Sequence, residues 1–120
     1  MTAPNVGNPT HPAVTNQLRL PRAAALGPGR GGQQRLLIDA PAGAAEIYLH
    51  GATLTSWVPR GGSEVIFTSR QAVFDGATAI RGGIPLCLPE FGGGINGDAV
   101  PKHGWARIAP WRLRTVTTTD

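Results

Sequence analysis

A period-two alternation of apolar and polar residues in the middle of the chain most limits what it can fold into. The alternation runs through AEIYLH at residues 45–50, is broken by Gly51, and resumes through ATLTSWV at residues 52–58. Successive side chains of a strand point to opposite faces of a sheet, so this pattern, bounded by glycine and proline, is typical of half-buried antiparallel strands. The pattern therefore predicts two neighbouring strands.

Further strands are expected nearer the C-terminus. Residues 64–68 and 111–118 are rich in β-forming side chains, whereas residues 73–80 offer at most a single helical turn, which Gly76 weakens. We therefore predict an all-β fold built as a sandwich of short strands. The sequence stops inside or just after the last expected strand, so we expect part of a sandwich, incomplete at the C-terminus. Another copy or a further part of the protein would cover the exposed apolar face.

The N-terminal quarter of the chain has a different composition. Residues 1–32 contain five prolines and a cluster of glycines near their end, a content that resists both helix and sheet. We predict a flexible leader over 1–32, in which residues 14–20 could pair weakly as an edge strand. The ordered domain is expected over 33–120.

The net charge of +4 belongs to this leader. Residues 1–35 carry four arginines and no acid, whereas residues 36–120 carry seven basic and seven acidic side chains. Four arginines spread among proline and glycine make a sparse binding arm. We therefore expect no nucleic-acid partner and read the segment as a solvated tail.

Nothing in the sequence indicates a membrane or secretory protein. The apolar stretches are only a few residues long, and no basic segment precedes a sustained apolar core near the N-terminus. The single cysteine, Cys87, cannot form an internal disulfide, which permits a reducing cytoplasm. We expect a cytoplasmic protein in which Cys87 is a small buried hydrophobe.

The chemistry-bearing residues gather in RGGIPLCLPEFGGGINGDAVPKHGWAR, residues 81–107. Arg81 before two glycines could hold a carboxylate, a phosphate or sugar hydroxyls, or could be a surface arginine at a turn. His103 could be an acid/base, a hydrogen-bond donor to a sugar oxygen, or a packed core histidine. Trp105 and Trp111 are expected to pack in the core, and Trp105 could alternatively form an apolar sugar platform.

Two other kinds of site are excluded by pattern. The glycines after Phe91 are not followed by Gly-Lys-Ser/Thr and a helix, so they do not form a phosphate-binding P-loop. His11, His50 and His103 share no metal-ligand spacing, and no cysteine pair exists. We therefore expect no metal.

Two motifs together resemble those of the hexose-6-phosphate 1-epimerases. They are RGGIPLCLPEFG and PKHGWARIAPWRL, preceded in family order by LHGATLTSWVP, EVIFTS and AVFDGATAIRGG. The resemblance covers roughly residues 44–115. It implies a β-sandwich of the galactose-mutarotase type, without metal or cofactor, that interconverts the α and β anomers of a phosphorylated aldose.

The resemblance also implies roles for individual residues. Arg81, Lys102 and Arg107 take the family's ligand-contacting positions, with His103 beside them, and the ligand would be a small sugar phosphate. The catalytic histidine and glutamate of the family are expected beyond Asp120, so no catalytic residue is assigned here. Lys102 stands where the family often has a glutamine-like residue. Glu90 stands where an apolar or aromatic residue is common, and would oppose a phosphate unless paired with Arg81 or Lys102.

Three functions are compatible with the sequence. The first is the N-terminal part of a hexose-6-phosphate mutarotase, an isomerase, whose 120 residues alone would be inactive. The second is a catalytically silent carbohydrate-binding or regulatory module on the same fold. The third, a small basic nucleic-acid-binding β-domain, is disfavoured by the balanced charge of residues 36–120. Which hexose phosphate is preferred and the oligomeric state are left open.

Overall fold

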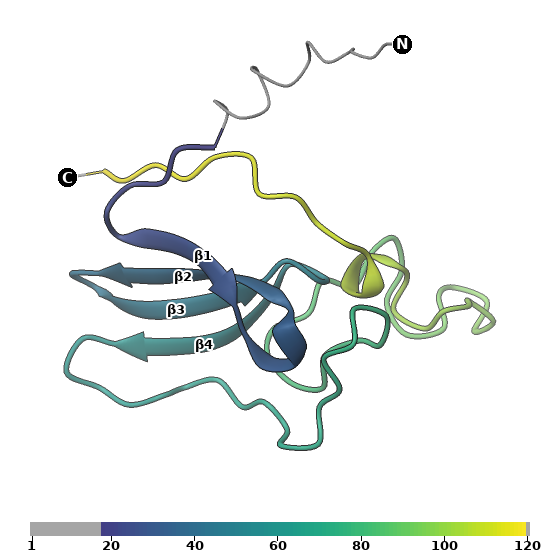
Figure 1. Cartoon of the computed structure of the whole chain (residues 1–120). Helices are drawn as coiled ribbons and strands as arrows, with labels where there is room; N and C mark the ends of the chain where they lie inside the picture. Colours follow the sequence, from purple (N-terminus) through teal and green to yellow (C-terminus); the bar gives the residue numbers. More distant parts are fainter. Residues whose placement is uncertain (1–17, 120) are drawn as a thin grey trace, which may run out of the picture.

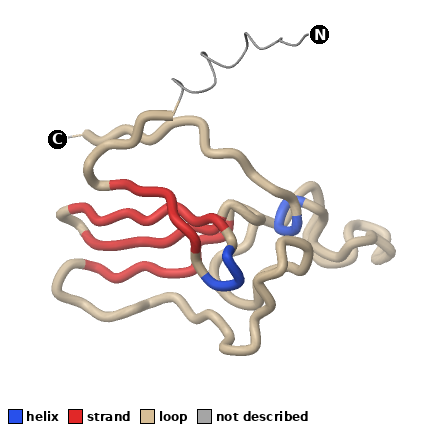
Figure 2. The backbone as a smooth tube through the Cα atoms, in the orientation of Figure 1, coloured by secondary structure: helices blue, strands red, loops and turns tan. Residues whose placement is uncertain are grey.

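One four-stranded antiparallel sheet organises residues 18–119, the part of the chain that the computed structural model describes (Figures 1 and 2). Its strands lie in sequence order: β1 (Ala24–Pro28), β2 (Gln34–Ala40), β3 (Gly43–Tyr48) and β4 (Thr53–Pro59). Two single 3-10 turns, η2 (Arg30–Gly32) and η3 (Ala106–Ile108), complete the regular structure of this part. The all-β class is confirmed, and residues 18–119 contain a single sheet.

The central alternation forms strands as predicted. β3 and β4 pair as a hairpin in which Tyr48 lies opposite Thr53. The register shifts between Glu46 and Ile47, where β4 has one extra residue. Such a bulge increases the local twist of the sheet.

Two predicted strands do not form. Residues 64–68 make only an isolated bridge, between Thr68 and Gly82, and residues 111–118 run on without a strand partner. Residues 73–80 form bends and no helical turn. Composition expresses a local preference, whereas a strand also needs a neighbour to accept its backbone hydrogen bonds. These segments make only scattered backbone hydrogen bonds and have no continuous strand partner within residues 18–119.

The expected boundary at residue 33 is wrong for the residues just before it. β1 pairs with β2 from Ala24 opposite Ile38 to Pro28 opposite Gln34, so residues 24–32 belong to the fold. β1 is an edge strand and Pro28 is its last residue, a position that tolerates the missing amide hydrogen. Of the segment considered as a possible edge strand, residues 18–20 are not in a strand and the rest lies outside the described residues.

The best-buried side chains lie where the loop before Arg81 covers the sheet. Tyr48, Phe74 and Ile80 form the core cluster, with Tyr48 only 1% exposed. The polar Thr53 and Thr55 are buried beside β3 and donate hydrogen bonds to the His50 carbonyl and to Glu46. This core is small, because many apolar side chains elsewhere remain exposed.

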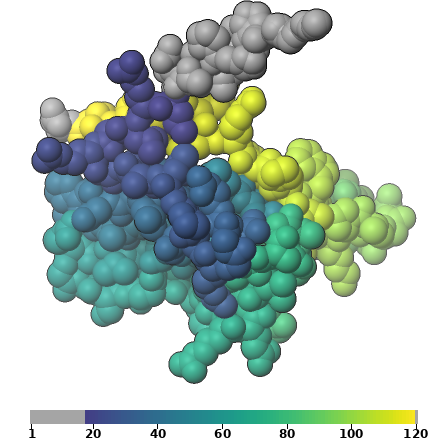
Figure 3. Space-filling model, in the orientation of Figure 1, coloured from purple at the N-terminus to yellow at the C-terminus, as the bar shows by residue number. Residues whose placement is uncertain are grey.

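The C-terminal segment crosses the sheet beyond β1. In Figures 1 and 3 it runs in yellow past the purple start of the described chain. A hollow of about 760 Å³ lies between them, lined by residues 21–24, 38, 40–42 and 116–119. The segment therefore covers this part of the sheet loosely.

Candidate functional site

Both motif segments are attached to the β3–β4 hairpin. The amide of Ile84 donates to the Leu54 carbonyl at 2.9 Å, and the amide of Gly51 donates to the Ala109 carbonyl at 2.8 Å. The stretch after Arg81 and the stretch after Arg107 are thus anchored within a few residues of one turn. The fold brings the two motifs to one end of the sheet.

The motif segments also bind each other. Leu88 forms a parallel bridge with Gly104, and the Ala106 amide donates to the Leu88 carbonyl at 3.1 Å. Gly104 has φ +75, and a Cβ there would overlap the Leu88 carbonyl. Only glycine permits this approach without strain.

His103 is held by its neighbours in a defined tautomer. The amide of Gly92 donates to His103 Nδ1 at 2.9 Å, and the amide of His103 donates to the Gly92 carbonyl at 2.8 Å. Since a backbone amide can only donate, Nδ1 accepts and the neutral ring carries its proton on Nε2. The Phe91 ring meets the imidazole edge-on at a centroid distance of 5.0 Å. His103 is half-buried and oriented, and its Nε2–H has no hydrogen-bond partner within residues 18–119.

Arg107 and Lys102 are adjacent in space. Arg107 Nη2 donates to the Lys102 carbonyl at 3.2 Å, which folds the guanidinium back along its own loop. Arg107 Nε is buried and has no hydrogen-bond partner within residues 18–119. The Lys102 side chain is exposed. An anion beside these two residues would give the unpaired guanidinium donors an acceptor.

Arg81 lies at the edge of a second hydrogen-bonded segment. Its side chain is exposed, and its carbonyl accepts from the Ser69 amide at 2.9 Å. Gly82, with φ +117, approaches the backbone of Thr68, where a Cβ would lie 2.6 Å from its Cα. The Gly82 position thus serves a close contact within the protein. Arg81 makes no hydrogen bond to Lys102, His103 or Arg107 in the part of the chain described.

The four predicted site residues form no ion pair within residues 18–119. The two ion pairs found in residues 18–119 are Arg35–Glu46 at 2.5 Å and Arg60–Asp39 at 3.0 Å. None of the four site residues takes part in them. The Glu90 carboxylate lies against Gly94 of the following loop and pairs with neither Arg81 nor Lys102. Arg81, Lys102, Arg107 and also Arg112 are therefore cations of the two motifs without an ion pair, and Glu90 is the acidic residue of these motifs.

Three expectations about packing are wrong. Trp105 is 58% exposed and Trp111 39%, with Trp111 Nε1 donating to the Ala106 carbonyl at 2.9 Å. Cys87 is only half-buried. These residues follow irregular backbone beyond the sheet, where no second layer within residues 18–119 encloses them.

Sequence reasoning missed the contacts that orient His103. In the sequence Phe91 and Gly92 stood out only as the start of a glycine run that forms no P-loop, yet they contact the imidazole ring. The bond joins residues 11 apart, and no local pattern signals it.

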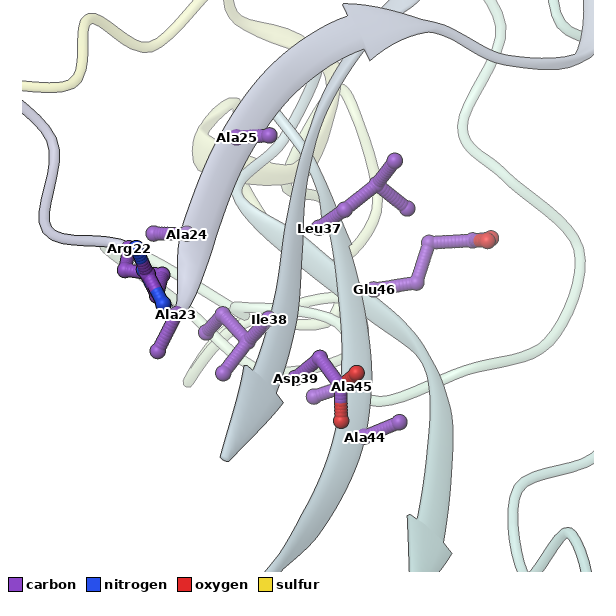
Figure 4. A pocket seen from close by; sticks show the side chains of 10 residues that line it. All are labelled: Arg22, Ala23, Ala24, Ala25, Leu37, Ile38, Asp39, Ala44, Ala45 and Glu46. Carbon is purple, nitrogen blue, oxygen red and sulfur yellow. The ribbon is translucent and has the colours of Figure 1, made fainter. Parts of the chain in front are cut away.

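Surface hollows at the sheet are not lined by any of the four site residues. One of about 290 Å³ lies over β1, β2 and β3, with small alanine side chains around Leu37 and the charged Arg22, Asp39 and Glu46 at its margins (Figure 4).

Within residues 18–119 no helix has the length and apolar character needed to cross a bilayer. The same residues contain no cluster of three histidine, cysteine or acidic side chains that could hold a metal ion.

Comparison with known proteins identifies relatives. Residues 34–120 match the family model for aldose 1-epimerase. A protein of Escherichia coli K12 that carries the provisional name glucose-6-phosphate 1-epimerase is 41% identical over 80 residues, which are 67% of this chain and 27% of that protein. One from Cenchrus ciliaris with the same provisional name is 48% identical over 69 residues, 58% of this chain and 20% of its own.

A solved structure agrees with these matches. The crystal structure of a provisionally named mutarotase from Salmonella typhimurium superimposes with a TM-score of 0.69 and 35% identity, over 79% of this chain and 32% of that one. The chain spans about a fifth to a third of the length of these relatives. The sheet, the two motifs and the family match agree, and the chain belongs to the aldose 1-epimerase family.

Proposed function

We propose that this chain provides the sugar-phosphate-binding part of a hexose-6-phosphate mutarotase. The observation that carries the proposal is that Arg81, Lys102 and Arg107 have no carboxylate partner within residues 18–119. Backbone hydrogen bonds fix the segments that carry them. Cationic donors fixed in this way suit a phosphate dianion and the sugar oxygens beside it.

Each side chain has a role that its geometry supports. Arg81 and Arg107 would bind phosphate and sugar oxygens through guanidinium groups that no carboxylate occupies within residues 18–119. Lys102 would add a single cationic donor. His103 would donate from Nε2 to a sugar oxygen, because its Nδ1 already accepts from Gly92. The provisional names of the relatives supply the class of substrate, an aldose 6-phosphate.

The reaction is acid/base ring opening and closure. A base takes the proton of the anomeric hydroxyl while an acid protonates the ring oxygen, and the C1–O5 bond breaks to leave an open-chain aldehyde. Rotation about C1–C2 and closure on the other face give the second anomer, with the two protons returned. The resemblance assigns the acid and base to a histidine and a glutamate downstream of residues 1–120.

A second candidate is a carbohydrate-binding module without catalysis. The described part of the chain favours it, since neither Glu90 nor Asp98 makes a hydrogen bond to His103 within residues 18–119 and no acid/base pair is assembled there. Binding of glucose 6-phosphate without any acceleration of mutarotation, in this chain and in a version extended to its relatives' length, would select it. For either function we propose a cytoplasmic location, which the single free Cys87 permits.

The proposal is tested by titrating the 120-residue chain with glucose 6-phosphate and with glucose, followed by NMR. We expect the phosphate ester to bind more tightly and to shift the resonances of Arg81, His103 and Arg107. Arg81→Ala and Arg107→Ala should each weaken binding by about 1–3 kcal/mol, the range of a charge-assisted hydrogen bond. Arg60→Ala, which removes an exposed arginine paired with Asp39, is the control. Equal affinity for both sugars, or no effect of either site variant, would overturn the proposal.

A further inference from the structure

We propose that Arg30 is a positioning residue that fixes the backbone at Arg81 through the segment at residues 67–70. Arg30 belongs to η2, which lies before the first residue matched by the family model. The part of this inference that concerns ligand affinity rests on the proposed function. The part that concerns the backbone does not.

The Arg30 side chain donates hydrogen bonds to the start of the loop that leads to Arg81. Its Nη1 donates to the Ser69 carbonyl at 3.4 Å and its Nη2 to the Arg70 carbonyl at 3.2 Å. The guanidinium lies over the Phe74 ring, with 4.4 Å between Cζ and the ring centroid. A planar fork that bonds two successive carbonyls and stacks on an aromatic ring holds one geometry, which a lysine could not reproduce.

The backbone of Arg30 is also fixed. Its amide donates to the Tyr48 hydroxyl at 2.9 Å, and Tyr48 packs on Phe74 with 4.8 Å between the ring centroids. Tyr48 is the most buried aromatic side chain of the core cluster. Arg30 thus connects strand β3, through Tyr48, to the loop at residues 69–74.

The segment that Arg30 holds is hydrogen-bonded to the backbone at Arg81. The Ser69 amide donates to the Arg81 carbonyl at 2.9 Å, Thr68 bridges Gly82, and the Gly83 amide donates to the Phe67 carbonyl at 2.7 Å. Residue Ser69 therefore binds Arg30 through its carbonyl and Arg81 through its amide. A shift of Ser69 would move the backbone from which the Arg81 side chain projects.

A purely structural role for Arg30 predicts a different result. Arg30 packs on the core ring Phe74, so its removal could simply lower global stability. Lower global stability would weaken protection at every slowly exchanging amide. A positioning role would act first on the Ser69 amide and on the geometry of Arg81.

The first arm of the test measures hydrogen exchange by NMR in the 120-residue chain, for wild type, Arg30→Ala and Arg30→Lys. We expect the Ser69 amide to exchange about 5- to 10-fold faster in Arg30→Ala, as for the loss of one ordinary hydrogen bond. The Gly51 amide, bonded to the Ala109 carbonyl at the other motif, should be unchanged. Arg30→Lys should be intermediate, and it keeps the test decisive if Arg30→Ala does not fold.

The matched control is Arg60→Ala. The exposed Arg60 side chain also donates hydrogen bonds to two backbone carbonyls, those of Ala40 and Pro41. These carbonyls are far in sequence from the motif segments. Arg60→Ala should leave Ser69 exchange unchanged. Unaltered Ser69 exchange in both Arg30 variants, or equal acceleration at Ser69 and Gly51, would overturn the inference.

The second arm titrates the same variants with glucose 6-phosphate. We expect Arg30→Ala to bind about 3- to 10-fold more weakly, Arg30→Lys to recover part of this loss, and Arg60→Ala to bind as wild type. If wild type does not bind, the proposed function fails while the exchange arm still decides the role of Arg30. Faster Ser69 exchange with unchanged affinity would contradict the link from the backbone to the ligand.

Discussion

Individual polar side chains hold much of this protein's irregular chain in place. Asp75 accepts from the amides of Ala77 and Thr78 and from the Thr78 hydroxyl. The Thr78 carbonyl in turn lies 2.8 Å from His50 Nε2, which donates to it from the buried ring. Asp75 thus stabilises the turn that covers the end of β3. Glu64 acts similarly on the loop after β4, through Ser56 and the amides of Trp57 and Ile66.

These bonds predict an acid-sensitive turn at Asp75. The Thr78 and Ala77 amides and the Thr78 hydroxyl lower the pKa of Asp75 from 3.8 to about 2. A carboxyl whose folded pKa is depressed contributes stability above its unfolded pKa, and that stability is lost as the pH falls through the folded pKa. We expect Asp75→Asn to be less stable than wild type above about pH 4, with the difference fading toward pH 2.

Urea unfolding at several pH values from 2 to 5 measures this difference. The pKa of Glu64 is also lowered, chiefly by the Ser56 hydroxyl, so wild type alone would show both losses together. The difference in stability between wild type and Asp75→Asn isolates the contribution of the Asp75 carboxylate. Asp98→Asn, at another exposed loop aspartate, is the control. A difference that stays constant down to pH 2 would mean that the Asp75 charge plays no part.

At the scale of elements, close backbone approach organises the motif region more than strand pairing does. The Leu88–Gly104 bridge and the Gly92–His103 bonds join the motifs without any named strand. Alternation predicted β3 and β4 because both have a partner in the hairpin. The same β-forming composition at residues 64–68 and 111–118 did not produce strands, and β1 formed among residues whose proline and glycine content predicted none.

Replacing Gly104 with alanine should therefore be costly. The left-handed φ alone costs a non-glycine residue about 1 kcal/mol or somewhat more, and the overlap with the Leu88 carbonyl adds to it. Gly61 has a similar φ of +76 but open space around its Cβ position, so Gly61→Ala should cost only the backbone term. We expect Gly104→Ala to lower the free energy of unfolding by at least about 1 kcal/mol more than Gly61→Ala. If urea unfolding showed equal losses of unfolding free energy for the two variants, the Leu88 carbonyl would be able to move aside at little cost.

On the scale of the whole molecule, the exposed apolar surface is the dominant feature. Phe67, Phe91 and Ile95 are 76%, 77% and 101% exposed, around a core cluster of three side chains. Contiguous exposed apolar surface marks interaction or aggregation. The sequence-based expectation of an uncovered sheet face and the exposed side chains both lead to the same prediction of self-association.

We expect the 120-residue chain to self-associate reversibly as its concentration rises. Sedimentation velocity at increasing concentration should show species larger than the 12.5 kDa chain. Phe67→Ser, which replaces an exposed ring without touching the core, should shift the distribution toward the monomer. Arg112→Ser, a polar exposed substitution, is the control and should leave the distribution unchanged. A monodisperse wild-type monomer would contradict the prediction.

We also expect residues 1–120 alone to show no measurable mutarotation of glucose 6-phosphate. Ring opening needs an acid and a base on opposite sides of the C1–O5 unit, and neither Glu90 nor Asp98 makes a hydrogen bond to His103 within residues 18–119. Exchange NMR at matched concentrations of this chain and of an extended version measures it. Comparable rates would require the pair to be sought among His103, Glu90 and Asp98.

Local sequence patterns were enough to predict the all-β class, the β3–β4 hairpin and the family to which the two motifs point, because alternation and short motifs involve only neighbours in the chain. Which β-forming segments pair was settled by the folded arrangement, since a strand's backbone groups need a partner that composition does not name. Folding also settles which residues accompany the site. Arg30 reaches Ser69 across 39 residues and Gly92 orients His103 across 11, and contacts between residues so far apart in the chain exist only once it has folded.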